Sequence, residues 1–313
     1  MILQTLQTTM VGVAYTGILR AAYPAARIRW LPIIACYAAS VAMNSVLPAN
    51  IGTFALLFMF LMIIPGATFP GVFSGYLVQK IFYTVVGTAI YLYLFLSVPG
   101  SFDISLGGLD AHKWLALAIA AGVIFGLVVL AGIFWRKVKH LWEQAKQGAA
   151  ILATPSRYAT RVLAPQLVGY LAKLGVIAIF LATYGIPVTA HSIFSVIGSS
   201  SIANTVAVTP GGAGVNQAAN VVALQSVTDS ATATAYSVGQ QVFTTAWNIV
   251  FAVIMISWAF GWKGGRQMVK ASYIQAKARA AEEKAKRREK KSERRADDGK
   301  RGAGAEAPPS EEA

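Results

Sequence analysis

The sequence VFSGYLVQKIFYTVVGTAIYLYLFLSV, residues 72–98, contains a single charged residue, Lys80, in an otherwise uncharged and mostly apolar run. A helix needs about 20 predominantly apolar residues to cross the hydrocarbon core of a bilayer. This run is long enough, so it predicts a membrane-spanning helix. The fold class that follows is all-α, a polytopic transmembrane helix bundle.

The rest of the chain has the same character. Of its 313 residues, 56% are hydrophobic and 13% are charged, and the mean hydropathy is +0.55. A soluble domain carries about a quarter of its residues as charged side chains. Segments 51–64, 192–208 and 215–227 are short or polar for a full crossing, which predicts re-entrant or protein-buried helices. The other candidate spans are 1–19, 30–47, 114–135, 162–186 and 236–258.

Positive charge is concentrated in a few places. Residues 263–301 carry fifteen Lys and Arg against six Asp and Glu. This excess of positive charge accounts for most of the chain's net charge of +14. Because this excess lies beside long apolar segments, it indicates an anionic membrane surface as partner and no nucleic acid. Basic residues also follow the first span at Arg20, Arg27 and Arg29. The positive-inside rule then predicts a multi-pass protein of the plasma (inner) membrane with a cytoplasmic C-terminus.

We therefore divide the chain into a membrane domain, residues 1–262, and a tail, residues 263–313, that is first basic and then acidic. The tail is expected to be largely disordered or to lie as a helix on the anionic leaflet. A solvated charge run with no specific role is the alternative.

Residues 204–217, NTVAVTPGGAGVNQ, interrupt the second half of the chain. Irregular backbone at membrane depth is tolerated only where protein buries it or where it lines a wet cavity. A related frame, NSVLPANIG, occupies residues 44–52 in the first half. Broken segments in corresponding positions of two halves point to a binding site near the bilayer midplane. The alternative is a tight helix–helix turn in which glycine serves packing.

Two lysines, Lys80 and Lys173, lie well inside apolar runs. A lysine near the bilayer centre costs roughly 2.5–3.5 kcal/mol on insertion scales, so it usually faces a cavity or a partner. The alternative is that the ammonium group reaches the head groups along its own helix. An anionic lipid phosphate is the counter-charge that we expect.

These motifs together, residues 44–52, the span with Gln79 and Lys80, and PGGAGVNQ at 210–217, resemble the flippase-like membrane domain of lysylphosphatidylglycerol synthases. The resemblance covers most of residues 1–260 and implies a domain that moves or handles phospholipids or polyprenyl lipids. The aminoacyltransferase domain of that family does not follow residue 262, so the chain is not expected to be an enzyme. Amides, Gln79 and Gln217, stand where the family often has carboxylates.

The predicted function is binding and translocation of an anionic phospholipid or polyprenyl phosphate, without a cofactor or metal. The alternatives are a membrane scaffold that recruits a partner through its basic tail, and a small-solute transporter. Gly122 and Gly126 form either a homodimer face or an intramolecular packing face. The residues predicted to bind the lipid are Asn44, Pro48, Gly52, Gln79, Lys80, Lys173, Asn204, Pro210, Gly211, Gly212, Gly214 and Gln217.

Overall fold

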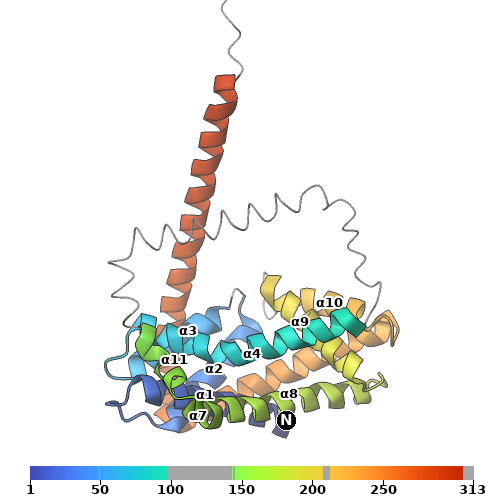
Figure 1. Cartoon of the computed structure of the whole chain (residues 1–313), viewed down its shortest axis with the longest axis horizontal. Helices are drawn as coiled ribbons and strands as arrows, with labels where there is room; N and C mark the ends of the chain where they lie inside the picture. Colours follow the sequence, from blue (N-terminus) through green and yellow to red (C-terminus); the bar gives the residue numbers. More distant parts are fainter. Residues whose placement is uncertain (49, 98–142, 144, 207–211, 306–313) are drawn as a thin grey trace, which may run out of the picture.

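The computed structural model describes residues 1–48, 50–97, 143, 145–206 and 212–305, and throughout this part the regular elements are helices (Figure 1). The predicted all-α class is confirmed for these residues. The elements in chain order are α1 (Ile2–Ala22), α2 (Trp30–Val46), α3 (Ile51–Ile63), α4 (Phe69–Ser97), a short turn of 3-10 helix (Ala150–Ala153), α7 (Pro155–Tyr158), a π-helical turn (Ala159–Leu163), α8 (Ala164–Thr183), α9 (Ala190–Val206), α10 (Val215–Leu224) and α11 (Ser230–Ala305).

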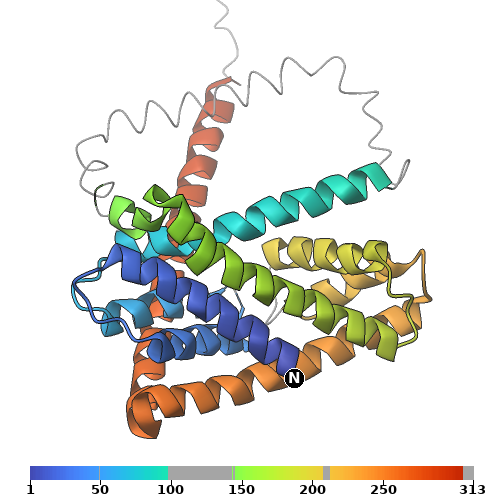
Figure 2. The same ribbon diagram turned by 60° about the horizontal axis from the view of Figure 1, so that its bottom comes forward.

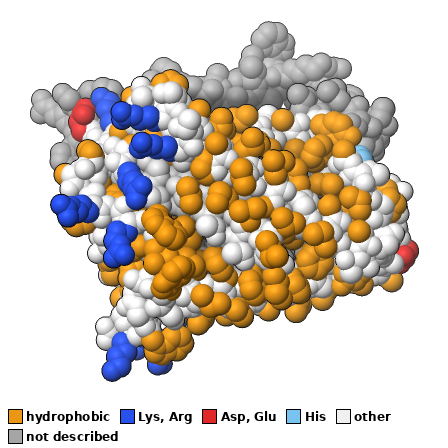
Figure 3. All heavy atoms as spheres, turned by 90° about the horizontal axis from the view of Figure 1, so that it is seen from below, with side chains coloured by type: hydrophobic (Ala, Val, Ile, Leu, Met, Phe, Trp, Pro, Cys, Tyr) orange, Lys and Arg blue, Asp and Glu red, His pale blue; other side chains and the backbone are white. Residues whose placement is uncertain are grey.

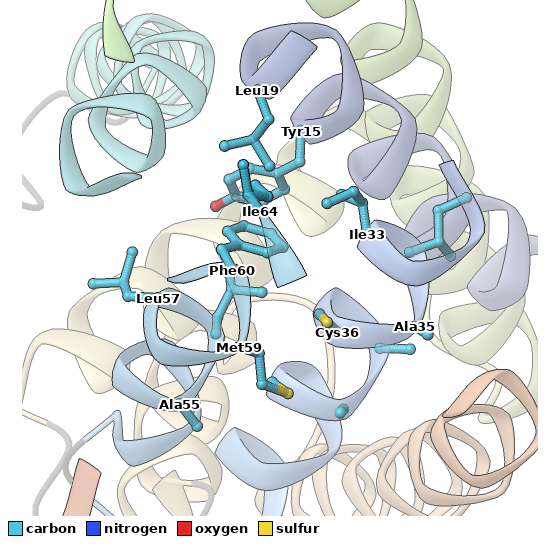
Figure 4. Close-up of a cluster of buried hydrophobic side chains, with 14 of the residues drawn as sticks. Tyr15, Leu19, Ile33, Ala35, Cys36, Ala55, Leu57, Met59, Phe60 and Ile64 are labelled. Atoms are coloured by element: carbon cyan, nitrogen blue, oxygen red, sulfur yellow. The ribbon is translucent and has the colours of Figure 1, made fainter. Parts of the chain in front are cut away.

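Small residues let the helices approach one another closely. A Cβ added at Gly12 of α1 would touch Ile34 of α2, and one added at Gly169 of α8 would touch the α1 backbone at Gln7. The main core cluster lies between α1, α2, α3 and α11. Figure 4 shows part of it, where Tyr15 of α1 lies against Phe60 of α3 with ring centroids 5.6 Å apart. Close backbone approach and aromatic packing thus hold this half of the molecule together.

The two interrupted segments, residues 44–52 and 204–217, fall within two helical hairpins, α2–α3 and α9–α10. α11 packs against α2, α3 and α10, so it contacts both hairpins. The first hairpin turns through Asn50, whose φ of 54° is left-handed. Gly52 then has no room for a side chain, because a Cβ would meet the Ser40 carbonyl oxygen and the Asn44 side chain. The second hairpin resumes at Gly214, with φ of 84°.

α11 changes direction at Gly261, where φ is 71° and ψ is 158°. Its first part runs along the bundle, and the far end of its second part projects away from the bundle (Figures 1 and 2). The expected boundary after residue 262 therefore lies just past this bend. The residues that follow still pack on the bundle, since Ser272 is fully buried and Met268 contacts the main core cluster.

Two stretches of the described chain, Pro155–Thr183 and Ser230–Gln275, are long and apolar enough to cross a membrane. Trp30–Val46 and Ile51–Ile63 are apolar but shorter. The face formed by α1, α8 and the first part of α11 is covered by hydrophobic side chains over its middle, and Lys and Arg gather at one end (Figures 2 and 3). This surface is compatible with membrane insertion.

Other predictions fall outside the described residues. These are the span at residues 114–135, the glycines Gly122 and Gly126 within it, the preceding loop, and the acidic end of the tail at residues 306–313.

Candidate functional site: a polar cavity around Lys173

A cavity of about 340 Å³ lies between α1, α2, α8, α9, α10 and α11. Among the described residues on its wall, Lys173 is the one with a formal charge, and none is Asp, Glu or His. The electrostatic character of this wall is therefore positive. The polar residues of the wall are Gln4, Gln7, Ser45, Lys173, Ser200, Asn216, Asn220, Ser237, Gln240, Gln241, Thr244, Thr245 and Asn248.

Lys173 reaches the cavity from the middle of α8 and is half-buried. Val176 and Ile177 line the same wall three and four residues later, which places all three side chains on one face of the helix. Pro165 comes just after the π-helical turn Ala159–Leu163, and from there α8 continues without a break to Thr183. The helix thus holds the ammonium group inside the bundle on a regular backbone.

One group of hydrogen bonds ties the second hairpin to α11 at this cavity. The Ser199 hydroxyl donates to Asn220 Oδ1 at 2.6 Å, and Asn220 Nδ2 donates to the Ser237 hydroxyl at 2.8 Å. All three residues are buried. α9, α10 and α11 are therefore joined through a single asparagine side chain.

A second group ties the first hairpin to α1 and α11. Gln4 Nε2 donates to Asn248 Oδ1 at 3.0 Å, and Asn248 Nδ2 donates to the Ser45 hydroxyl at 3.3 Å. Close by, the Trp247 indole donates to the Thr5 hydroxyl at 2.9 Å. A buried asparagine again joins three helices, so the cavity lies between two polar junctions.

Lys80 is not among the residues that line this cavity, but it lies against an aromatic cluster that reaches α8. Its Nζ lies 5.2 Å from the ring centroid of Tyr76 and 6.0 Å from that of Tyr83. Tyr83 in turn contacts Tyr170 with centroids 6.3 Å apart, and Tyr170 lies one helical turn before Lys173 on α8. Aromatic rings thus connect Lys80 of α4 to the turn of α8 that carries Lys173. Lys80 itself is exposed on α4, whereas Lys173 is half-buried.

The other predicted site residues have structural contacts of their own. Gln79 is buried and accepts a hydrogen bond from the Tyr15 hydroxyl at 3.2 Å, which joins α4 to α1. Asn44 donates to the Thr53 hydroxyl at 3.2 Å and lies against Gly52, inside the first hairpin. Pro48 is half-buried in the turn of that hairpin.

In the second hairpin, Gln217 reaches the cavity wall indirectly. Its Oε1 accepts from the Gly214 N–H at 2.6 Å, and its Nε2 donates to Gln241, which lines the cavity. Gly212 and Gly214 both adopt left-handed φ values before α10 begins. Pro210, Gly211 and the side chain of Asn204 lie outside the described residues.

The amide and hydroxyl residues of α11 were not predicted as site residues, although the sequence carries a signal for them. Gln240, Gln241, Thr244, Thr245 and Asn248 follow a helical spacing of polar residues inside an apolar span. Such a stripe marks one face of a helix that is turned away from lipid. The tyrosine cluster has a weaker signal, since its rings come from different helices.

A metal site is not indicated: no three His, Cys, Asp or Glu side chains gather within the described residues. In comparisons with known proteins, neither a family model, a curated protein nor a solved structure matches this chain.

Proposed function

We propose that this protein is a polytopic membrane protein that binds the phosphate of an anionic lipid at Lys173 and lets the head group pass between leaflets. The observation that carries this proposal is the pairing of a lysine with a polar cavity whose described wall holds no carboxylate. A phosphate would supply the missing negative charge. The similarity of the sequence motifs to the flippase-like domain of lysylphosphatidylglycerol synthases points the same way.

The position of the cavity along α8 supports a site at membrane depth. Lys173 precedes the end of α8 at Thr183 by roughly 15 Å, at 1.5 Å of rise per residue. The hydrocarbon core of a bilayer is roughly 30 Å thick, so this distance is about half of it. The cavity is also lined by Ser45 near the end of α2 and Asn216 near the start of α10, where both hairpins are interrupted.

The basic residues support the orientation. Arg20, Arg27 and Arg29 lie at or beyond the end of α1, and a Cβ at Gly17 would touch the backbone of Arg161. These segments therefore share the basic end of the bundle. We assign this end, together with the bend at Gly261, to the cytoplasmic face of the plasma membrane.

Lipid exchange between leaflets in proteoliposomes tests the proposal. Fluorescent phosphatidylglycerol and phosphatidylcholine serve as reporters, and Lys173→Gln is compared with wild type. The matched control is Lys146→Gln, because Lys146 is an exposed lysine that pairs with Glu143 at 3.3 Å, away from the cavity. We expect Lys173→Gln to lower phosphatidylglycerol exchange at least tenfold, and Lys146→Gln to leave it unchanged.

Unchanged exchange in a folded Lys173→Gln protein would contradict the proposal. A thermal unfolding midpoint at or above that of wild type shows that the variant is folded. Uptake of a small anion that depends on Lys173, without any lipid exchange, would favour a solute transporter instead.

A membrane scaffold is a second candidate, favoured by the second part of α11, which extends helical structure to Ala305 beyond the bundle (Figure 1). Truncation after Lys277 separates the two functions. Lipid translocation should survive this deletion, whereas recruitment of a partner through the tail should not.

A further inference from the structure

A second hollow, of about 570 Å³, lies between α2 and α11 on both sides of the bend at Gly261. We call it the bend groove. Its described wall contains Ala39, Ala42, Met43 and Leu47 of α2, Ile249, Ala252, Val253, Ile256 and Ser257 before the bend, and Trp262, Gly265, Arg266, Val269, Lys270 and Tyr273 after it.

The bend groove is chemically divided. The walls from α2 and from α11 before the bend are almost entirely apolar, and small side chains such as Ala39, Ala42 and Ala252 leave it open. Arg266 and Lys270 stand four residues apart after the bend, so they share one face of the helix. The described wall contains no Asp or Glu. One region of the groove therefore suits a hydrocarbon chain and the other suits an anion.

Two glycines create this shape. Gly261 adopts a φ of 71°, which lets α11 change direction, and a side chain at that φ would be strained. Gly265 then lies so close to Ile256 that a Cβ would collide with it. The two parts of α11 consequently stay close together, and the basic residues remain beside the apolar wall.

We propose that the bend groove binds one acyl chain of an anionic phospholipid from the leaflet at the basic end of the bundle, with its phosphate at Arg266 and Lys270. The proposal rests on the membrane placement given above, but it does not require lipid movement. Trp262 and Tyr273 on the same wall suit the head-group region, where amphipathic rings are favoured. An anionic head group gains more from these two cations than a zwitterionic one such as phosphocholine, because the quaternary ammonium of the latter is repelled by Arg266 and Lys270.

The bend groove lies next to the cavity around Lys173 along the same two helices. α2 contributes Met43 to the groove and Ser45 to the cavity, and α11 contributes Ile249 to the groove and Asn248 to the cavity. The hydrogen bond between Asn248 and Ser45 lies on the cavity side of this boundary. A lipid held in the groove would thus be stored beside the cavity.

Photo-crosslinking in vesicles tests the site. The full-length protein is reconstituted with a trace of phosphatidylglycerol or phosphatidylcholine that carries a diazirine in one acyl chain, and the labelled peptides are identified by mass spectrometry. We expect phosphatidylglycerol to label residues 39–47 and 249–257 several times more than phosphatidylcholine does. The double variant Arg266→Gln, Lys270→Gln should remove most of this difference.

The matched control is Lys263→Gln, Lys277→Gln, which removes the same charge from the same helix at exposed positions outside the groove wall. It should leave the labelling as in wild type. A third variant, Ala42→Phe, fills the groove without a change of charge and should lower the labelling by both lipids.

Equal labelling by the two lipids, an equal loss in the control variant, or labelling confined to other helices would each overturn the proposal. Labelling of the groove that persists in Lys173→Gln, after exchange has stopped, would show that the groove and the translocation site are separate functions. An absence of lipid labels on any helix would instead contradict the membrane placement itself.

Discussion

Lys173 is informative at the scale of a residue because its neighbours do not neutralise it. The described cavity wall offers hydroxyl and amide groups but no carboxylate. Polar groups of this kind can solvate an ammonium group and can also hydrogen-bond an incoming phosphate ester. The depth of Lys173 in an apolar run predicted it as a binding residue. The aromatic connection between Lys173 and Lys80 runs through tyrosines of α4 and α8, which no local sequence pattern reveals.

Gly52 offers a sharp test of the first hairpin at the same scale. We expect Gly52→Ala to destabilise the protein by about 2–3 kcal/mol, because the new Cβ would collide with the Ser40 carbonyl oxygen and with Asn44. The matched control is Gly87→Ala in α4, where the added Cβ would meet no atom of another described helix within 4 Å. That change should be neutral or stabilise by up to about 1 kcal/mol.

Unfolding in the same detergent measures both glycine variants. Equal stability of the two would show that the close contact between α2 and α3 is absent, and the geometry of the first hairpin would have to be revised.

At the scale of elements, the two asparagine junctions predict separable effects. Asn220→Ala removes the link between α9, α10 and α11, and Asn248→Ala removes the link between α1, α2 and α11. Each change should cost about 2–3 kcal/mol, because buried polar partners lose their hydrogen bonds.

Hydrogen exchange distinguishes the two asparagine variants. Faster exchange should appear in α9 and α10 for Asn220→Ala, and in the first turns of α1 and the last turn of α2 for Asn248→Ala. The same exchange pattern in both variants would mean that the hairpins are not held independently.

The start of α11 carries a pH-sensitive cap. The Asp229 carboxylate accepts bonds from the Thr232 backbone N–H at 2.9 Å and from its hydroxyl at 2.7 Å. The Thr232 hydroxyl, followed by its backbone N–H, lowers the pKa of Asp229 in the folded protein. The charged carboxylate therefore stabilises the fold above its ordinary pKa of about 3.9, and this contribution is lost as the pH falls through the lower folded value.

We expect wild type to unfold at a higher temperature than Asp229→Asn above about pH 4, and the gap to narrow below it. Thermal unfolding between about pH 2 and pH 6 checks this. A gap that is constant or widens toward low pH would show that the Asp229 charge does not cap α11.

At the scale of the whole molecule, the helix order was predictable because apolar length and Pro or Gly interruptions are local signals. The expected segments 30–47, 51–64 and 215–227 agree with α2, α3 and α10 to within a few residues. The continuation of the tail as one helix to Ala305 was one of two expectations, and the bend at Gly261 was not predicted. Which side chains face the cavity depends on how six helices pack, so Asn220 and Asn248 had no signature as junctions.

Reversible blocking of the cavity around Lys173 shows whether lipid passes through it. The natural cysteine, Cys36, is buried, so Cys36→Ala with Ser200→Cys places one reactive thiol on the cavity wall. Val222→Cys in the same background puts the thiol on the exposed side of α10 as a control. A bulky methanethiosulfonate reagent should abolish phosphatidylglycerol exchange in the Ser200→Cys protein, a reductant should restore it, and the control should be unaffected. Full exchange in the labelled Ser200→Cys protein, or failure of its thiol to react at all, would contradict a lipid path through this cavity.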